Sequence, residues 1–431
     1  MMKINFLLFL ITLNLLFSCN LFFDKEEEKD NKNRYPIFNA KVSWRSDTKF
    51  NSHFYGVQNG KHLYSYENIS VIAEFQYDLK KSLFRVMKLD IETGNVLWRS
   101  DNLPKTANCS PVLSDNKLFL LVDDDLLYCL DADNGNILTV IKINDNFSNH
   151  RIEQNLISHN NFIYFGFSYR NIYLDRRITG ISRIDINNLV YDNITEPQTI
   201  EPEMFWESKY NSRVMSLPVF KDNIMYFMTY TDGILNIANR DKTLEFAAIN
   251  TDNKEILWYK EIFDDDGSGH LLINDNIIYM MNTNVSAFNL TDGERIYIKS
   301  ASGFSPMRAL GSVFYNNKLY YTNGNFSVRG EGKNPNVVSL NADDGSLAWG
   351  WLDYDCFSLG VVPLITNDKV YLPLEYGFTV LNAHTGKVLG VDRNFYGQGI
   401  FGVIFQYNNL LIYPNRNKDG YSNYIAIDIS E

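Results

Sequence analysis

The histidines are the residues that could most readily hold a metal ion or move a proton. The six are His53, His62, His150, His159, His270 and His384. Metal sites often place two such ligands a few residues apart, as in HExxH, and no pair here has a comparable spacing. The chain also lacks the GxSxG nucleophile motif, the Walker phosphate loop and a glycine-rich fingerprint after a strand. We therefore expect no metal site among these histidines, and the local motifs do not favour an enzyme.

One acidic stretch has part of the pattern of a calcium loop. Asp264, Asp266 and Ser268 stand at alternate positions before Gly269, as in the first half of an EF-hand. Such oxygen ligands can converge on a hard cation, and the glycine allows the chain to bend sharply. The flanking segments resemble strands rather than helices, and Asp275, at the twelfth position, belongs to a predicted turn. The sequence favours a solvated acidic loop, with a calcium site as the alternative.

The cysteines do not form a disulfide framework. Besides Cys19 the chain has Cys109, Cys129 and Cys356, and no CxxC or CxxCH motif occurs, so zinc-ribbon and c-type haem sites are not expected. Cys109 and Cys129 are predicted to lie two strands apart, about 9–10 Å from each other. A disulfide needs Cα atoms within about 7 Å, so we expect free, buried thiols.

The N-terminus has the pattern of a targeting segment. Lys3 precedes an apolar run from Phe6 to Phe17 that is too short to span a bilayer, and Leu16-Phe17-Ser18-Cys19 resembles a bacterial lipobox. A charged stretch, DKEEEKDNKN, follows. We predict a lipoprotein signal peptide in residues 1–18 and a lipidated Cys19 with a flexible tether in residues 19–39. The alternative is an ordinary secretory signal with an incidental cysteine.

The composition narrows the class of protein. The formal net charge of −11 argues against a nucleic-acid binder, which normally carries a basic face. After the N-terminus no apolar run of about 18 residues occurs, so the body is not predicted to cross a membrane. Aromatic residues make up 14% of the chain, and asparagine is abundant, which favours strands joined by tight turns.

A short motif recurs along the chain. Its first copy is LDIETGNVLWRS, and later copies include LDADNGNILTVI, INTDNKEILWYK and LNADDGSLAWGW. Aligned on the Asp or Asn, the motif has eight copies, about 40 to 65 residues apart. The aligned residues are Asp90, Asp131, Asp185, Asn250, Asn289, Asn341, Asn382 and Asp428.

A second motif, two strands joined by a short polar turn, precedes each copy of the first. Examples are PVLSDNKLFLL and SVFYNNKLYYT, and this motif also occurs eight times. Each unit therefore consists of four strands, A to D, with a tight A–B turn and an Asp…Gly C–D turn. Such a period with four strands per unit indicates a propeller. We predict that residues 40–431 form an all-β, eight-bladed β-propeller of four-stranded antiparallel blades.

Large rings recur at one position of the repeat. Glycines such as Gly94 stand where the C–D turn needs a positive φ, and a large ring follows the Asp or Asn by eight residues in several units. The N-terminal segment AKVSWRS resembles a strand D, while the last unit ends after strand C. We predict that these two pair and close the ring, which removes two exposed sheet edges. The tryptophans predicted to pack between blades at this position are Trp44, Trp98, Trp206, Trp258 and Trp349.

The pattern LDxxTGxxLW resembles the PQQ-like repeat, and the resemblance covers nearly all of Ala40 to Glu431. That family includes quinoprotein alcohol dehydrogenases and the BamB-type lipoprotein of outer-membrane barrel assembly. Eight blades behind a lipobox resemble the lipoprotein branch. Resemblance to the enzymes would imply an adjacent Cys-Cys pair, a tryptophan platform and calcium-binding carboxylates. This chain has no adjacent cysteines, so we expect no PQQ cofactor.

The long B–C connections are the predicted partner-binding rim. They run from Glu67 to Ser82, Arg170 to Ile178, Asp232 to Thr243 and Asn323 to Asn336, while the A–B turns on the opposite rim are tight. Variable loops on a rigid scaffold usually carry recognition. The basic residues predicted on this rim are Arg170, Arg176, Arg177, Arg240, Arg329 and Lys333. The alternative is that these insertions are neutral and the arginines only solubilise the surface. An acidic insertion at 187–203 lies on the opposite rim, without an assigned role.

The sequence favours a monomeric, non-enzymatic scaffold anchored by lipid to the bacterial outer membrane, on its periplasmic face. The protein partner implied by the resemblance is the outer-membrane barrel-assembly complex. One alternative is an envelope lipoprotein that binds a carbohydrate or a host ligand. A second is an enzyme whose site is assembled from loops on the propeller rim.

Overall fold

The computed structural model describes most of the chain between Lys41 and Ser430. The described residues are 36, 41–48, 53–54, 56–69, 83–104, 110–122, 126–143, 150–152, 156–171, 176–191, 196–208, 212–214, 218–231, 244–262, 270–281, 284–300, 311–322, 337–352, 362–374, 377–392, 401–402, 404–416 and 422–430. Among them, no helix is long and apolar enough to span a membrane.

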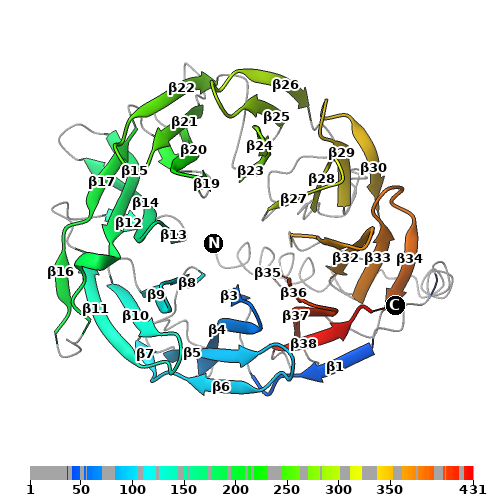
Figure 1. The fold of residues 1–431 in the computed structure, drawn as a ribbon, viewed down its shortest axis with the longest axis horizontal. Helices are drawn as coiled ribbons and strands as arrows, with labels where there is room; N and C mark the ends of the chain where they lie inside the picture. The colour runs from blue at the N-terminus through cyan, green and yellow to red at the C-terminus, as the bar shows by residue number, and fades with distance from the viewer. Residues whose placement is uncertain are drawn as a thin grey trace, which may run out of the picture.

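The chain forms a ring of eight antiparallel sheets, which confirms the predicted all-β, eight-bladed propeller (Figure 1). Blade 1 contains β3 (Gly56–Asn59), β4 (His62–Ile69), β5 (Leu83–Asp90) and β6 (Val96–Arg99). Blade 2 contains β8 (Val112–Ser114), β9 (Lys117–Val122), β10 (Leu126–Asp131) and β11 (Ile137–Ile143). Blade 3 contains β13 (Ile157–His159), β14 (Phe162–Asn171), β15 (Arg176–Asp185) and β17 (Glu203–Glu207). Blade 4 contains β19 (Val219–Lys221), β20 (Ile224–Thr231), β21 (Leu244–Asn250) and β22 (Ile256–Ile262).

The second half of the ring repeats this arrangement. Blade 5 contains β23 (His270–Asn274), β24 (Ile277–Met281), β25 (Asn284–Asn289) and β26 (Arg295–Ser300). Blade 6 contains β27 (Ser312–Tyr315), β28 (Lys318–Thr322), β29 (Val337–Asn341) and β30 (Leu347–Trp351). Blade 7 contains β31 (Leu364–Thr366), β32 (Lys369–Leu374), β33 (Gly377–Asn382) and β34 (Val388–Asp392). Blade 8 contains β36 (Phe405–Tyr407), β37 (Leu410–Arg416), β38 (Ser422–Asp428) and β1 (Lys41–Arg45).

Short strands extend several blades. The additional strands are β7 (Leu103–Pro104), β12 (His150–Ile152), β16 (Gln198–Ile200) and β18 (Ser212–Val214). They pair with β5, β14, β11 and β20, respectively. In addition, β2 (His53–Phe54) pairs with β35 (Phe401–Gly402).

Every A–B connection is a two-residue turn with a left-handed first residue. Its φ lies between 45° and 56° in all eight blades. Hairpin turns of this kind match the twist of the strands, and Gly, Asn and Asp adopt them at the lowest cost. The first turn residues are Gly60, Asp115, Asn160, Asp222, Asp275, Asn316, Asn367 and Asn408.

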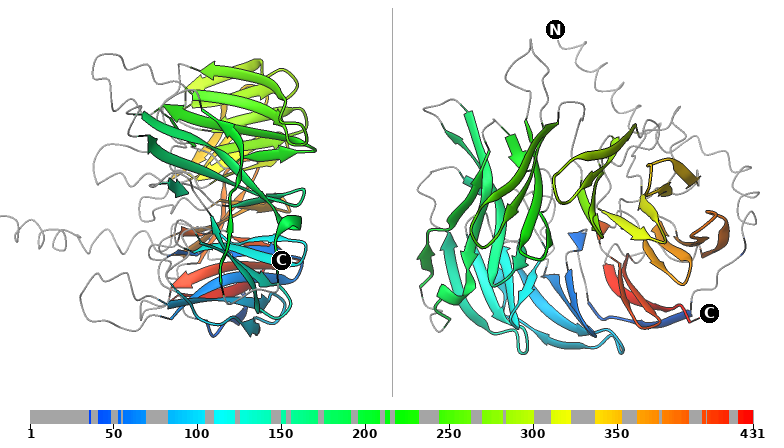
Figure 2. Two further views of the ribbon diagram at one scale, coloured as in Figure 1. Left: turned by 90° about the vertical axis from the view of Figure 1, so that its left-hand side faces the viewer. Right: turned by 45° about the horizontal axis from the view of Figure 1, so that its top comes forward.

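One backbone hydrogen bond joins the two repeated motifs in every blade. The residue after the aligned Asp or Asn donates its N–H to the carbonyl of the second A–B turn residue, at 2.8–3.1 Å. In blade 1, for example, Ile91 donates to Lys61. The C–D turn is therefore fixed on the A–B turn of its own blade, and both lie on the same rim (Figure 2). This contact explains why the two motifs occur in equal number and fixed order.

The N-terminal strand closes the ring, as predicted. β1 pairs antiparallel with β38, with Trp44 opposite Ala426, and the two lie side by side in Figure 1. Ser46 extends this contact by donating its N–H to the carbonyl of Tyr424 at 2.9 Å. Just before β1, the Pro36 carbonyl accepts a hydrogen bond from the N–H of Val391, on the D strand of blade 7.

The prediction of a long loop from Arg170 to Ile178 is wrong. The structure continues β14 and β15 through it as a hairpin, with Arg170 opposite Arg177 and Asn171 opposite Arg176. The residues FIYFGFSYRN and RRITGISRID have enough β-branched and aromatic side chains to extend both strands beyond the usual blade length. Only residues 172–175 therefore connect strands B and C of blade 3.

Candidate functional site: seams and rims of the propeller

Four tryptophans join neighbouring blades in the same way. The indole Nε1 of each donates to a carbonyl in the next C–D turn, and its ring lies over the glycine of that turn. At Gly94, φ is 75°, and an added Cβ would lie 2.5 Å from the ring of Trp44. The bonds are Trp44 to Ile91 (2.8 Å), Trp98 to Ala132 (3.2 Å), Trp258 to Leu290 (2.8 Å) and Trp349 to Ala383 (2.9 Å). The Tyr297 hydroxyl makes the equivalent bond to Ala342, at 2.9 Å.

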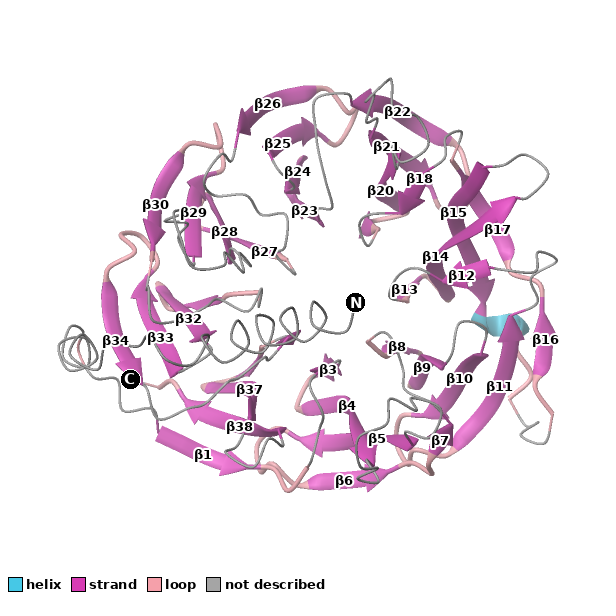
Figure 3. Cartoon of the chain, turned by 180° about the vertical axis from the view of Figure 1, so that it is seen from behind, coloured by secondary structure: helices cyan, strands magenta, loops and turns pink. Residues whose placement is uncertain are grey.

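We call the contact between two neighbouring blades a seam. At the seam between blades 2 and 3, strand D of blade 2 has no aromatic ring, because Thr139 stands at the position that tryptophan holds in other blades. The acidic insertion supplies one instead. After the 3₁₀ turn η3 (Ile186–Asn188), the Tyr191 hydroxyl donates within blade 3 to the Ile186 carbonyl at 2.5 Å, the acceptor position that a tryptophan of the preceding blade uses elsewhere. Gln198, on β16, donates to the Thr139 hydroxyl at 2.9 Å. The insertion, for which the sequence suggests no role, therefore completes this seam (Figure 3).

Trp206 lies elsewhere than the sequence predicts. It pairs with Ile181, whereas the residue opposite Arg183, which corresponds to the tryptophan position of other blades, is Glu203. Strand β17 is thus displaced by two residues along β15, and the Trp206 ring packs edge-on against Phe227. This contact also joins blades 3 and 4, but it is not the tryptophan–glycine contact.

Arg183 makes the missing bond to blade 4. Its Nη1 donates to the Thr251 carbonyl at 2.7 Å, and its Nε donates to Glu203 at 2.6 Å. Lys254 forms a further ion pair with Glu203. Burial opposes ionisation of Glu203, but these two cations hold the pKa of its carboxyl below the ordinary value. A charged pair therefore replaces an indole at this seam.

The rim formed by the tight A–B and C–D turns is rich in carboxylates that accept hydrogen bonds from neighbouring turn residues. Asn116 donates to Asp133, Asn223 to Asp252 and Asn317 to Asp343, each at 2.7 Å. In blade 1, burial of Asp90 opposes its ionisation, but hydrogen bonds from Thr93 hold its pKa below the ordinary value. These carboxylates shape turns, so their presence does not indicate a catalytic site.

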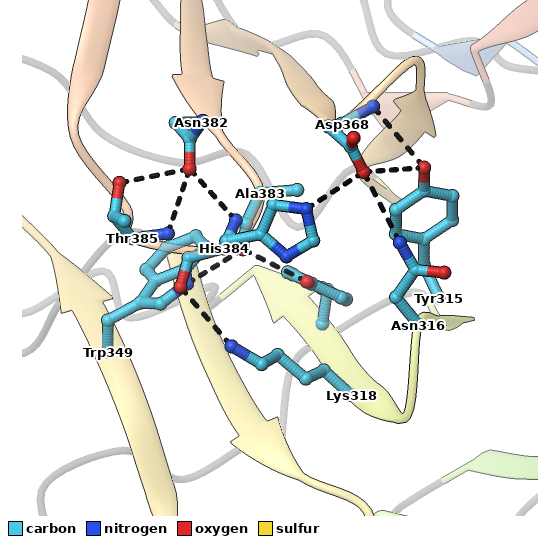
Figure 4. Close-up of polar contacts among 10 residues, drawn as sticks. Tyr315, Asn316, Lys318, Trp349, Asp368, Asn382, Ala383, His384 and Thr385 are labelled. Atoms are coloured by element: carbon cyan, nitrogen blue, oxygen red, sulfur yellow. Dashed lines mark hydrogen bonds and ion pairs between the residues drawn. The ribbon is translucent and has the colours of Figure 1, made fainter.

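A histidine, an aspartate and a tyrosine meet where blades 6 and 7 touch on this rim (Figure 4). His384 Nε2 lies 2.9 Å from Asp368 Oδ1, which also accepts a hydrogen bond from the Tyr315 hydroxyl at 2.9 Å. The His384 carbonyl accepts a bond from Lys318. About half of the His384 and Asp368 side chains is exposed. The cluster links two blades, and the lysine that could act as a nucleophile is directed to a backbone carbonyl.

Among the histidines whose side chains the structure describes, His270 is the one whose pKa burial lowers most. It begins strand A of blade 5; in the described part of the chain both ring nitrogens are buried without a hydrogen-bond partner. Burial lowers the pKa of His270 to about 4. The imidazole is therefore neutral near pH 7, and no sequence pattern singles it out.

Replacement of His270 by Phe is expected to reduce the loss of stability in acid. The folded protein takes up this proton only near pH 4, whereas the unfolded chain takes it up near 6.5. The unfolded state therefore binds more protons in this window, and stability falls as the pH drops from 6.5 to 4. The contribution of one such group is about 3 kcal/mol at most. Urea unfolding at pH 7 and pH 4.5 measures it; an equal acid sensitivity in both proteins would contradict this role.

Cys129 is a free thiol, as the strand geometry predicts. It is fully buried in β10, and burial raises its pKa to about 12, so the thiol stays protonated and unreactive. In the part of the chain that the structure describes, no group of three or more His, Cys, Asp or Glu side chains is placed to hold a metal ion.

The predicted partner rim is only partly within the described residues. The strands place the backbones of Arg170, Arg176 and Arg177 together at one end of blade 3. The remaining predicted site residues lie outside the described residues: Cys19, Arg240, Asp264, Asp266, Ser268, Arg329 and Lys333.

These features define an eight-bladed β-propeller, as the sequence predicts. Residues 82–157 match the family model described as outer membrane protein assembly factor BamB. No curated protein matches the chain in sequence.

Solved structures share the fold across nearly the whole chain. BamB from Moraxella catarrhalis is 14% identical, with a TM-score of 0.52, over 84% of this chain and 97% of that one. Quinohemoprotein alcohol dehydrogenase from Comamonas testosteroni is 12% identical, with a TM-score of 0.61, over 91% and 77%. The computationally designed Ika8 protein is 12% identical, with a TM-score of 0.54, over 90% and 98%. At such identities the likeness concerns the fold alone.

Proposed function

We propose that the protein is a non-enzymatic interaction scaffold of the bacterial cell envelope, with a BamB-like role in outer-membrane protein assembly. The match of residues 82–157 to the BamB family model supports this assignment. The geometry agrees, because the recognisable repeat residues are used in contacts between strands and blades. We therefore expect the long B–C connections, on the rim opposite the tight turns, to bind the partner. We call this the long-connection rim.

In this proposal Cys19 carries the lipid, and the protein faces the periplasm from the outer membrane. Pro36, the first described residue after Cys19, accepts a hydrogen bond from the N–H of Val391 on the outer strand of blade 7. Attachment of the chain at this outer strand is compatible with access of a partner to both rims. We further propose that the protein works without a quinone, since the chain has no adjacent cysteines of the kind that the enzyme resemblance implies.

Charge reversal at blade 3 is expected to weaken partner capture. Arg176 and Arg177 stand at the start of β15, beside Arg170 on the paired strand. Replacing both with Glu changes the local charge by four units and should reduce the recovered partner about tenfold or more, because arginine is a frequent hot-spot residue and reversed charge places like charges against a complementary partner. The measurement is affinity pull-down of the full, membrane-extracted protein, with quantification of barrel-assembly proteins by mass spectrometry.

The matched control is Lys387→Glu, an exposed residue on the rim of tight turns. It should leave recovery within about twofold of the wild type. Recovery of polysaccharide or host ligands in place of barrel-assembly proteins would support the alternative envelope function instead.

A further inference from the structure

The outer edges of the blades are strands with one unpaired side. Strand D is the outermost of the four blade strands; among the described residues, β1, β6, β17, β22, β26, β30 and β34 each end their sheet, and blade 2 is the exception (Figure 1). An unpaired edge presents backbone N–H and C=O groups that can pair with another extended segment.

Blade 2 shows how this propeller covers such an edge. Strand β16, from the insertion, adds to β11 in parallel as a fifth strand, with Lys142 opposite Thr199 and Ile143 opposite Ile200. It lies outside β11 in both Figure 1 and Figure 3. Gln198 adds a side-chain bond to Thr139. A segment with three paired residues is thus enough to cover an edge.

The covered edge also partly buries an apolar side chain whose counterparts in other blades are exposed. In most blades a β-bulge in strand D leaves one residue without a partner on strand C. In blade 2 this residue is Leu138, which packs with Tyr191 and Ile200 of the insertion against a buried cluster. The uncovered counterparts are Leu97 (51% exposed), Leu257 (43%), Ile296 (51%) and Leu389 (41%).

Blade 4 reproduces the covered edge of blade 2 most closely. β22 and β11 are both seven residues long. The D strands of blades 1, 5, 6 and 7 begin at the same place in the repeat but are four to six residues long. β22 carries two adjacent exposed apolar residues, Ile256 (50%) and Leu257 (43%). In the described part of the chain, no strand pairs with its outer side.

We propose that the outer edge of β22 binds an extended segment of a partner protein as a fifth strand. The segment would alternate β-branched apolar and polar residues, and an apolar side chain would cover Leu257 as the insertion covers Leu138. This surface is the circumference of the ring, so it is separate from the long-connection rim and does not depend on the partner proposed there.

The test measures binding of a labelled peptide, KTITVTITK, to the full chain in detergent by fluorescence anisotropy. The control peptide, KTITPTITK, carries a proline that interrupts strand pairing. We expect saturable binding of the first peptide and about tenfold weaker binding of the second. Leu257→Glu should weaken binding about tenfold or more, because it places a charge where the apolar side chain packs.

The matched variant Leu97→Glu alters the same position of blade 1, whose β6 has only four residues, and should leave affinity within about twofold. Circular dichroism confirms that both variants fold. Equal effects of the two variants, or no saturable binding to the wild type, would overturn the proposal. Self-association that Leu257→Glu abolishes, without peptide binding, would assign the edge to a second copy of the chain and overturn it equally.

Discussion

A chain that lacks residues 41–46 is expected to lose about 5 kcal/mol or more of unfolding free energy and to aggregate. Deletion removes strand D of blade 8 and leaves β38 with an unpaired edge. It also removes Val42 and Trp44, which pack against the largest apolar cluster of the described residues, together with the bond from Trp44 to the Ile91 carbonyl. Trp44 is partly buried, so it should account for the lower end of the roughly 3–5 kcal/mol that loss of a core tryptophan typically costs, before the lost strand pairing is added. Urea unfolding and size-exclusion chromatography measure the effect.

Truncation to Pro36 provides the control, because it keeps β1 and the contact with Val391. It should unfold at the same urea concentration as the longer chain. Trp44→Ala alone should lower the unfolding free energy by about 3 kcal/mol, a value between those of the two truncated chains. If the chain without residues 41–46 unfolded like the Pro36 truncation, ring closure by β1 would be wrong.

Replacement of Trp258 by Ala is expected to cost about 4 kcal/mol. The side chain is buried at the seam between blades 4 and 5, where its ring lies over Gly293. It packs edge-on against Phe246, with 4.9 Å between the ring centroids. Its Nε1 donates to the Leu290 carbonyl at 2.8 Å. Truncation therefore leaves both a cavity and an unpaired buried carbonyl. Trp258→Phe retains much of the packing and should cost about half as much. Thermal and urea unfolding measure both values.

The neighbouring Leu257 offers a matched control on the same strand. It is 43% exposed, so Leu257→Ala should change stability by about 0.5 kcal/mol or less. An equal loss for Leu257→Ala and Trp258→Ala would show that the seam contact is not a main source of stability.

The sequence was sufficient to predict the fold because turn chemistry repeats locally. Asn and Asp tolerate the left-handed φ of the A–B turns, and glycine is required where an indole lies against the C–D turn. Both motifs are short, so each can be recognised without knowledge of distant contacts. Ring closure by Trp44 could be predicted for the same reason, as its segment repeats the strand D pattern.

The exceptions depend on strand register and distant segments, which spacing does not reveal. Trp206 has the right residue type, but β17 pairs two residues further along β15. Arg183 then makes the bond to the Thr251 carbonyl. Tyr191 makes the bond to the Ile186 carbonyl, for which Thr139 has no suitable ring. The absence of a ring at Thr139, followed by an insertion with a tyrosine, was the signal that could have identified Tyr191.

The candidate partner rim was predicted from loop length and charge alone. At blade 3 the structure differs from this prediction. Arg176 and Arg177 belong to a strand rather than to a loop, which holds their backbones in a defined position. The chemistry of the partner is not encoded in the repeat, because the repeat residues serve the ring. A functional assignment therefore needs a direct measurement at the rim.

Site-specific photo-cross-linking in intact membranes tests the central claim most directly. A photoreactive residue in place of Arg177 reports on the long-connection rim, and one in place of the exposed Lys387 reports on the rim of tight turns. Our account predicts a cross-link to an outer-membrane barrel-assembly protein from position 177, with little or none from position 387. The same products from both positions, or no protein product from position 177, would contradict it.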